Sequence, residues 1–448
     1  MRYLPLTAQE RAEMMSTLGI QDVRELFACL SGHCTEPGNS LPPALSETEL
    51  INRFNEYAGR NRHLQYLSFL GGGAYPHFIP EVVDSLSSKG EFVTPYTPYQ
   101  PEVSQGSLQA MFEYQTMMTE LTGLDVTNSS LYDGGTAAAE ALLLTVRKSG
   151  KKKVLISASL HPEYHEIIRT YTQNLDIEIV TFARRHDDGK TDLEDLKGKL
   201  DEQTASVIIQ SPNFLGVIED GEAIARLSHI RGAYAVQVIN EALSLGFLRS
   251  PGENGMDVAA GEAQSFGLPL GFGGAYLGFL AVKEDLLRHL PGRLVGQTKD
   301  VDGRRGYVLT LSTREQHIKR EKATSNICSN EAWCAIRAAM YLATMGKEGV
   351  AKIAKINHLQ AAYFARQVAR IQDVRVRFTR DFFNEVVIDF AGIPVDEFLK
   401  KMRQKGIQAG IPLHWFNADM KESLLVAVTE IHQPADIDRL VSAMGEVL

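Results

Sequence analysis

The sequence predicts an α/β protein with a large sheet-based domain, a helical arm before it and a smaller α+β domain after it. Between about residues 65 and 320, six short apolar runs alternate with helical stretches. Continuous apolar runs are typical of parallel strands buried on both faces, and strands separated by helices form right-handed βαβ units. Beyond this region, long helices come first and strands follow. We therefore expect an arm over 1–64, a large α/β domain over 65–320 and a C-terminal α+β domain over 321–448.

The arm is expected to be helical. Thr7 is followed by Glu10, and Ser46 by Glu49, each ahead of an apolar run. This spacing is that of a capping box, in which a hydroxyl and a carboxylate satisfy free backbone N–H groups at the start of a helix.

The large domain is expected to contain a helix over Gly106–Thr122. Its apolar residues recur at three- and four-residue spacing, and Gly123 stands where a helix-ending glycine belongs. The apolar runs, all interpreted as buried parallel strands, are 153–157, 177–182, 206–210, 233–239, 257–261 and 277–282.

The C-terminal domain is expected to open with two long helices and to continue with short strands and two further helices. The segments are helices 331–345 and 347–371, strands 374–378 and 385–390, a helix, a strand near Ala409–Ile411, a strand over 424–429 and a last helix over 434–447. An arm, a large α/β domain and a small α+β domain make up the anatomy of many pyridoxal-phosphate enzymes. Anatomy alone does not assign a function.

Charge and hydropathy argue against two classes of protein, those that bind nucleic acid and those that span a membrane. The chain of 448 residues has 46 Lys and Arg against 55 Asp and Glu, a net charge of −9. This balance argues against a protein that binds nucleic acid electrostatically. No window approaches 18 uninterrupted apolar residues, so no membrane span is expected. The N-terminus has neither signal nor transit character, which favours a cytoplasmic protein.

Cysteine is scarce. Cys29, Cys34, Cys328 and Cys334 form no C-x-x-C pair, and four cysteines cannot build a disulfide framework in a chain of this length. We expect reduced thiols and no metal site. Cys328 and Cys334 are interpreted as buried small apolar residues.

A turn before one helix is a candidate phosphate site. Gly134, Gly135 and Thr136 open the helix that runs to Lys148. Glycines followed by a hydroxyl at a helix start present backbone N–H donors at the positive end of the helix dipole. The alternative is a tight turn with a helix cap.

Three other segments combine side chains that bind cofactors or substrates. Tyr96 and Tyr99 lie in a rigid, proline-containing loop that lines a pocket or, alternatively, covers the core. His161 follows strand 153–157, at the ligand-facing edge of an open sheet, where it stacks on a cofactor ring or is simply structural. Glu241 closes strand 233–239, where it pairs with a pyridinium nitrogen or is a solvated loop acid.

A charged run over 314–322 is interpreted as the surface of a helix with ion pairs four residues apart. Two readings of the polar segment Thr324-Ser325-Asn326 that follows remain open. Its hydroxyl and amide groups bind a phosphate, or they cap a helix that begins near Asn330.

Long specific segments then point to a family. They are YTPYQPEVSQG at 96–106, PGRLVGQT at 291–298 and REQHIKREKATSNIC at 314–328. With them, the chain resembles the P-protein of the glycine cleavage system, glycine dehydrogenase (decarboxylating), over nearly its whole length. The resemblance is to subunit 1, the N-terminal half of the form split into two chains. It implies the aminotransferase-like type I fold of pyridoxal-phosphate enzymes. It also implies decarboxylation of glycine and transfer of the aminomethyl group to the lipoyl arm of H-protein.

The resemblance also implies which residues remain functional. A lysine holds the cofactor as a Schiff base in the catalytic half of the family, and Gln264 stands at its position here, so this chain supplies no catalytic residue. Gly135, Thr136 and His161 then correspond to a vestigial cofactor pocket, and Tyr96 and Tyr99 to substrate contacts. Related first subunits tend to carry Asp-Pro where this chain has Glu241-Ala242, which leaves open whether a pyridinium contact survives.

The partner implied is a homologous second subunit that carries the lysine and the covalently bound pyridoxal phosphate, in an α2β2 assembly that also engages lipoylated H-protein and glycine. Thr324 is expected to reach across to the phosphate of the partner's cofactor. Two rival hypotheses are a self-sufficient pyridoxal-phosphate enzyme, which the missing lysine disfavours, and a non-catalytic scaffold or regulatory subunit.

Overall fold

The first 63 residues form one of the two units into which the chain divides, the other being Leu64–Leu448. The computed structural model describes residues 6–30, 32–33, 42–62, 65–328 and 330–448; Cys34 lies outside them. The helices described in the first unit are α1 (Ala8–Leu18), the 3-10 helix η1 (Val23–Leu30) and α2 (Glu47–Gly59). Both expected capping boxes are present, and none of these three helices has a buried residue.

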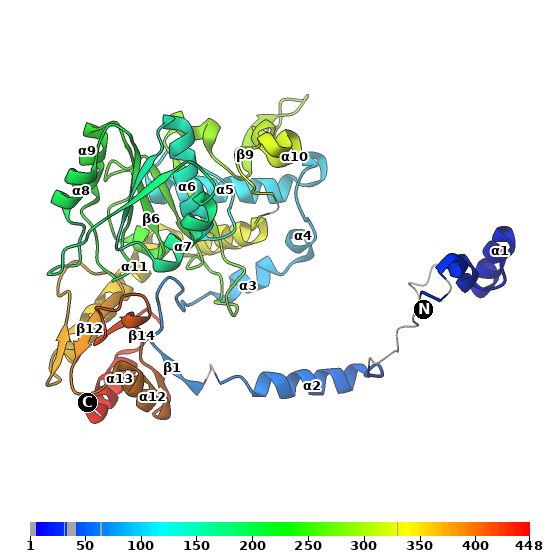
Figure 1. The fold of residues 1–448 in the computed structure, drawn as a ribbon. Helices are drawn as coiled ribbons and strands as arrows, with labels where there is room; N and C mark the ends of the chain where they lie inside the picture. The colour runs from blue at the N-terminus through cyan, green and yellow to red at the C-terminus, as the bar shows by residue number, and fades with distance from the viewer. Residues whose placement is uncertain (1–5, 31, 34–41, 63–64, 329) are drawn as a thin grey trace. The chain divides into compact units, whose positions relative to one another are not determined.

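A seven-stranded sheet organises the second unit (Figure 1). Its spatial order is β2-β8-β7-β6-β5-β3-β4. The strands are β2 (Val126–Thr127), β3 (Lys153–Ser157), β4 (Glu178–Phe182), β5 (Thr204–Gln210), β6 (Tyr234–Ile239), β7 (Val258–Glu262) and β8 (Gly278–Val282). From β7 to β4 the five strands are parallel, as the apolar runs predicted.

Helices cover both faces of this sheet. One face packs on α6 (Gly134–Ser149) and α7 (Pro162–Thr172). The other packs on α8 (Leu193–Lys199) and α9 (Gly221–Ile230) towards β4, and on α5 (Gln105–Thr122) and α11 (Ala332–Val368) towards β8. Helix α5 ends at Gly123 in the left-handed conformation, as expected. The carboxyl ends of the parallel strands therefore point to one edge, where the connections into helices begin.

Two predictions about the sheet were wrong in detail. Strand β8 is antiparallel to β7, because the segment between them contains no crossover helix, which a parallel return requires. A hairpin of β9 (Leu294–Lys299) and β10 (Arg305–Thr310) was not predicted. Only its first strand begins with two buried residues, so it lacks a continuous apolar run.

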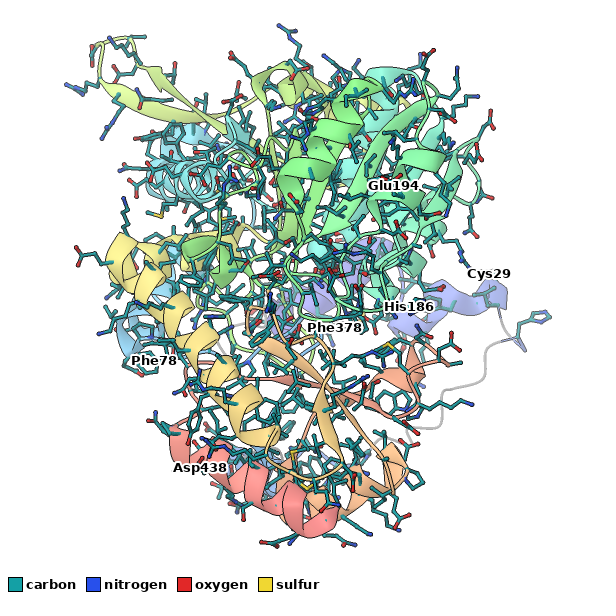
Figure 2. The ribbon with its side chains drawn as sticks, turned by 90° about the vertical axis from the view of Figure 1, so that its left-hand side faces the viewer. Cys29, Phe78, His186, Glu194, Phe378 and Asp438 are labelled. Atoms are coloured by element: carbon teal, nitrogen blue, oxygen red, sulfur yellow. The ribbon has the colours of Figure 1, made fainter. Side chains whose placement is uncertain are left out.

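The C-terminal part has a four-stranded sheet with the order β11-β12-β15-β14. Its elements are β11 (Val374–Val376), β12 (Glu385–Phe390), α12 (Val395–Gln404), β13 (Ile407–Gln408), β14 (Ile411–Pro412), β15 (Ser423–Ala427) and α13 (Pro434–Val447). Helix α11 is interrupted at Gly346, where φ is 60° and ψ 177°, so it consists of the two expected helices. In Figure 2, the labelled Asp438 lies on α13, and its carboxylate accepts a hydrogen bond from Tyr363 of α11 at 2.7 Å.

The C-terminal sheet is joined to the rest of its unit at several points. Strand β1 (Leu67–Ser68) pairs in parallel with β13. An apolar cluster that includes Phe214, which follows β5, and Phe378, which follows β11, connects the two sheets. Figure 2 labels Phe378. Residues Leu64–Leu448 therefore form one compact unit, and the further division after residue 320 stays a prediction.

The charged run over 314–322 does not form the expected helix surface. It contains α10 (Gln316–Lys319) and the 3-10 helix η7 (Arg320–Lys322), each about one turn long. Cys334 is buried as predicted, whereas Cys328 is only partly buried. Of the helices in the described ranges, none is both long and apolar enough to cross a membrane.

Candidate functional site

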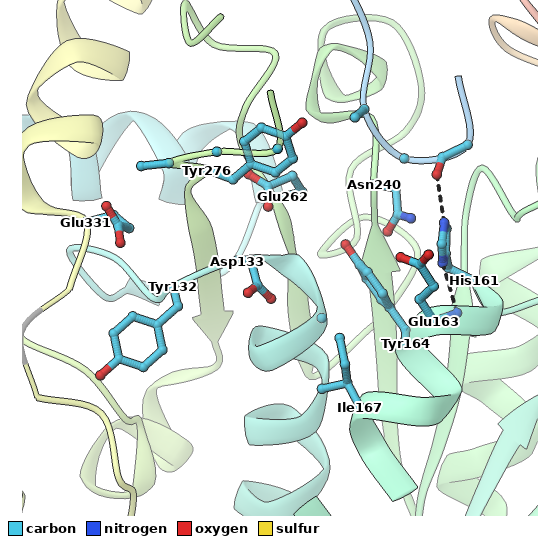
Figure 3. A pocket seen from close by; sticks show the side chains of 17 residues that line it. Tyr132, Asp133, His161, Glu163, Tyr164, Ile167, Asn240, Glu262, Tyr276 and Glu331 are labelled. Atoms are coloured by element: carbon cyan, nitrogen blue, oxygen red, sulfur yellow. Dashed lines mark hydrogen bonds between the residues drawn. The ribbon is translucent and has the colours of Figure 1, made fainter. Parts of the chain in front are cut away.

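A cavity of about 460 Å³ lies at the carboxyl ends of β6 and β7, beside the starts of α6 and α7 (Figure 3). The residues that line it come from the segment before α3 (Glu81–Ser87), from both helix starts, from the two strand ends, from the 273–276 loop and from the residue before α11. They are Gly72, Gly73, Ala74, Tyr132, Asp133, Gly135, His161, Glu163, Tyr164, Ile167, Asn240, Glu262, Gly273, Gly274, Ala275, Tyr276 and Glu331. This is the place where the sequence predicted a cofactor pocket.

The start of α6 is capped from within the chain. Asp133 Oδ1 accepts a hydrogen bond from the Thr136 N–H at 2.7 Å, and the Thr136 hydroxyl donates to the Asp133 carbonyl at 3.0 Å. Gly135 lines the cavity, and a Cβ there would collide with Ile167 Cδ1. Thr136 does not line it. Of the two predicted phosphate contacts, the structure therefore brings only Gly135 to the cavity wall.

A buried carboxylate accepts a hydrogen bond from the first backbone N–H of this helix. Glu262 is 2% exposed, and its Oε2 accepts a hydrogen bond from the Gly134 N–H at 2.9 Å. Its Oε1 accepts from the N–H groups of Gln264 at 3.0 Å and Leu277 at 2.7 Å. Burial raises the pKa of Glu262 to about 7, against the opposing effect of these N–H donors. The acid thus lies where a helix start would otherwise bind an external anion.

Gln264, at the position of the expected lysine, is bound by the backbone around it. Its Nε2 donates to the Leu268 carbonyl at 2.5 Å, and its Oε1 accepts from the Tyr75 N–H at 3.4 Å. The side chain is buried and is not among those that line the cavity. A carboxamide cannot condense with an aldehyde, so this position cannot form a Schiff base.

His161 lines the cavity as predicted, and both of its ring nitrogens are bound. Nδ1 accepts a hydrogen bond from the Glu163 N–H at 3.2 Å, and Nε2 donates to the Gly72 carbonyl at 2.7 Å. Burial lowers the pKa of His161, so the ring is neutral near pH 7. Its centroid lies 4.9 Å from that of Phe214 and 5.1 Å from that of Tyr164.

Glu241 lies in a different cluster, beside the cavity but not in its wall. Its Oε2 is 2.9 Å from His77 Nε2, and His77 Nδ1 is 2.9 Å from Glu430 Oε2. Burial alone lowers the pKa of His77, but the two carboxylates outweigh it and raise that pKa to about 10. The cluster joins the end of β6 to the residues just before α3 and after β15. Sequence reasoning missed His77, because it follows no strand and belongs to no motif.

Tyr96, Tyr99 and Thr324 lie outside this cavity. Tyr96 is 81% exposed, and the half-exposed Tyr99 accepts a hydrogen bond through its hydroxyl from Arg293 Nη2 at 2.6 Å. Thr324 lines a separate cleft of about 220 Å³, together with Arg288, Leu311, Thr313, Arg314, Lys319 and Lys322.

The segment around Thr324 does not cap α11. The N-cap position of α11 is Glu331, with no side-chain capping hydrogen bond. Ser325 instead donates a hydrogen bond to Glu140 Oε1 at 2.8 Å. The capping alternative for 324–326 is therefore wrong.

The charges of the cavity decide whether pyridoxal phosphate fits it. Its described lining contains four carboxylates, those of Asp133, Glu163, Glu262 and Glu331, and neither lysine nor arginine. A phosphate dianion would meet like charges there, and an aldehyde would find no amine. The residues of this cavity therefore do not fit pyridoxal phosphate. Sequence reasoning missed Glu262 and Glu331; the first could have been noticed as an acid directly after a buried strand.

Comparisons with known proteins agree on one family. The model of the glycine cleavage system P-protein family matches residues 1–444. The chain is 46% identical over 447 residues to the probable glycine dehydrogenase (decarboxylating) subunit 1 of Geobacillus kaustophilus (strain HTA426), with 99% of each chain covered. A crystal structure of glycine decarboxylase (P-protein) of the glycine cleavage system, in inhibitor-bound form, superimposes with a TM-score of 0.90, at 40% identity and full coverage of both chains.

A more distant likeness concerns the fold alone. The sphingosine-1-phosphate lyase Bpss2021 of Burkholderia pseudomallei K96243 has a TM-score of 0.68 at 14% identity, with 92% of this chain and 94% of that chain covered. Together these likenesses confirm the predicted type I fold of pyridoxal-phosphate enzymes.

Proposed function

The chain belongs to the glycine cleavage system P-protein family, and on that premise we propose that it is subunit 1 of a glycine dehydrogenase (decarboxylating). With a second subunit, it decarboxylates glycine and transfers the aminomethyl group to the lipoyl arm of H-protein. The observation that carries the proposal is the end-to-end match to relatives that bear this name, in which each chain is covered almost completely.

We further propose that the second subunit is a homologue that holds pyridoxal phosphate covalently through its lysine. Two features of this chain support that division of labour. The carboxamide of Gln264 is bound to backbone groups at the lysine position, and four carboxylates line the cavity. The isolated chain is then inactive in glycine decarboxylation.

The cleft around Thr324 supports a role for this chain at its partner's site. Arg288, Arg314, Lys319 and Lys322 line the same cleft as Thr324, and this combination of cations and a hydroxyl suits a phosphate dianion. The chain's own cavity does not include Thr324, so the residue acts across the interface in this proposal. Tyr96 and Tyr99, also outside the cavity, then contact substrate in an α2β2 assembly.

Co-expression with the second subunit tests the proposal. Size-exclusion chromatography should give a heteromeric complex, and the complex should exchange bicarbonate into the carboxyl group of glycine when H-protein is added. The isolated chain should show no exchange. Activity of the isolated chain, with a borohydride-reducible adduct on one lysine, would support the self-sufficient enzyme. Full activity of the second subunit alone would support the scaffold.

A further inference from the structure

The cleft that Thr324 lines gathers cations from four short helices. They are Arg288 of the 3-10 helix η5 (Glu284–His289), Arg314 of the 3-10 helix η6 (Ser312–Arg314), Lys319 of α10 and Lys322 of η7. We propose that this cleft is complete in the single chain and binds a free phosphate dianion before a partner arrives. The inference rests on the proposed function only in naming a second source of the same ligand, the phosphate of the partner's cofactor.

The first observation is that these cations have no counter-ions. None of the four has a carboxylate partner within the described residues, and no acid is among the side chains that line the cleft there. Glu315, which follows Arg314 in the chain, instead lies 4.0 Å from Arg293 Nε and 3.6 Å from His317 Nδ1. The whole chain carries a net charge of −9, so a general attraction of anions is not expected. The cleft is therefore a local cationic site on an acidic protein.

The second observation is that one of these cations is buried. Arg314 is 9% exposed, and its Nη2 donates a hydrogen bond to the Gly292 carbonyl at 3.0 Å. Burial lowers the pKa of Arg314, and the charge of Glu315 only partly offsets this effect. A buried charge without a close counter-ion costs free energy. A bound anion would reduce that cost.

The third observation concerns hydroxyl groups and size. Thr313 and Thr324 line the cleft, and neither side chain has a hydrogen-bond partner in the part of the chain that the structure describes. Hydroxyl and charged donors together match the several acceptor oxygens of a phosphate. The volume of about 220 Å³ lies below the roughly 300–1,000 Å³ that is usual for organic ligands. The cleft therefore suits a compact anion.

A carboxylate, such as an acidic side chain of a partner, is the alternative occupant. It offers two oxygens and one negative charge, whereas the cleft presents four cations and two hydroxyls. A phosphate dianion has more oxygens and more charge, so it uses more of these donors. Acetate is therefore the comparison anion in the test.

Calorimetric titration of the isolated full-length chain with inorganic phosphate tests the proposal. Chloride keeps the ionic strength constant, because added salt screens exposed charges. We expect saturable binding at one site per chain. Acetate should bind roughly ten-fold more weakly, the effect of losing at least one charge-assisted hydrogen bond.

Matched variants locate the binding. Lys322 and Arg320 are both exposed cations of η7, but only Lys322 lines the cleft. Lys322→Gln should weaken phosphate binding about five-fold, as for loss of one exposed ion pair, and Arg320→Gln by less than about two-fold. Thr324→Ala, which changes no charge, should weaken it roughly ten-fold.

Association with the second subunit distinguishes the two sources of phosphate. Free phosphate should weaken association with the cofactor-loaded partner, because both phosphates need the same donors. It should not weaken association with the apo partner. If phosphate binds the isolated chain but does not affect association with the loaded partner, the phosphate site is supported, and the role of Thr324 across the interface is rejected.

Three results would overturn the proposal. They are the lack of saturable phosphate binding to the folded wild-type chain, equal weakening by Lys322→Gln and Arg320→Gln, and binding of acetate as tight as that of phosphate.

Discussion

The Oε2 atom of Glu262 lies 2.9 Å from the backbone nitrogen of Gly134 and accepts its hydrogen bond. The two residues bring the end of β7 to the start of α6, and a carboxylate of the protein thereby lies at a helix start that favours anions. The sequence pattern at 134–136 was interpreted as a phosphate site or as a capped turn, and the structure shows a capping box there, with the carboxylate of Glu262 at the first N–H of the helix.

Gln264→Lys should not convert this chain into a holoenzyme. The variant regains an amine, but Glu262 still occupies the helix start, and the other carboxylates still repel a phosphate. Incubation with pyridoxal phosphate, borohydride reduction and mass spectrometry should show no stoichiometric pyridoxyl adduct at position 264. Wild-type protein treated in the same way is the control. A stoichiometric adduct at that position would show that the acids do not exclude the cofactor.

His77→Leu should destabilise the fold strongly. The substitution leaves the buried carboxylates of Glu241 and Glu430 without their shared partner, which costs about 3–5 kcal/mol for a buried ion pair. Urea unfolding measures the change in the free energy of unfolding. His414→Leu is the control, because Asp396, its partner, is exposed and the change should stay below about 1 kcal/mol. Similar losses for both variants would contradict the role of the cluster.

The same cluster predicts a pH dependence in alkaline solution. The pKa of His77 is about 10 in the folded chain and 6.5 in the reference state, so the folded chain holds this proton more tightly. Its stabilisation is complete below pH 6.5 and is lost as the pH rises towards 10. Burial raises the pKa of Glu262 and of Glu385 only to about 7, so their titration does not change the free energy of unfolding above neutral pH. Above pH 8, the free energy of unfolding should therefore depend less on pH in His77→Leu than in the wild-type chain. An equal dependence in the two proteins would refute the assignment.

Gly278→Ala should disturb the contact between β8 and the start of α6. A Cβ at this position would collide with the Asp133 carbonyl oxygen, which is backbone and cannot turn aside. Overpacking of this kind costs about 1–3 kcal/mol. Gly445→Ala, in α13 with open space around it, should be neutral or stabilising, because alanine favours helix. Thermal unfolding compares the two variants, and equal melting temperatures would contradict the prediction.

Thr324→Ala tests the role across the subunit interface. In the assembled complex, it should weaken retention of pyridoxal phosphate roughly ten-fold, the effect of losing one charge-assisted hydrogen bond. The melting temperature of the isolated subunit should not change, because Thr324 does not cap α11. Titration of cofactor into apo complex measures the first effect. Unchanged affinity together with a lowered melting temperature would assign the residue a purely structural role.

Local signals predicted much of the fold. The bounds of β12 and α13 agree with the sequence interpretation at both ends, because apolar periodicity and a proline at the first turn mark them. The direction of β8 was missed because a continuous apolar run shows burial but not orientation. The hairpin of β9 and β10 was missed because most of its residues are exposed or only partly buried.

The candidate site was less predictable, because its character comes from pairs of residues far apart in the chain. Gly135 could be placed from its position at a helix start, and His161 from its position after a buried strand. The bond between Glu262 and Gly134 depends on how β7 and α6 meet. A single sequence contains no local pattern for such a relationship.

The pairing of β1 with β13 has a consequence for synthesis on the ribosome. Leu67 pairs with Ile407, and His77 binds Glu430. Residues just after the arm therefore find their partners only among residues that are translated near the end of synthesis. The large sheet can form while these early residues still wait for their partners. Contacts so distant in sequence close slowly, and unpaired strand edges favour aggregation. Premature termination anywhere before β13 should therefore yield an insoluble nascent product, even when the whole seven-stranded sheet has been made.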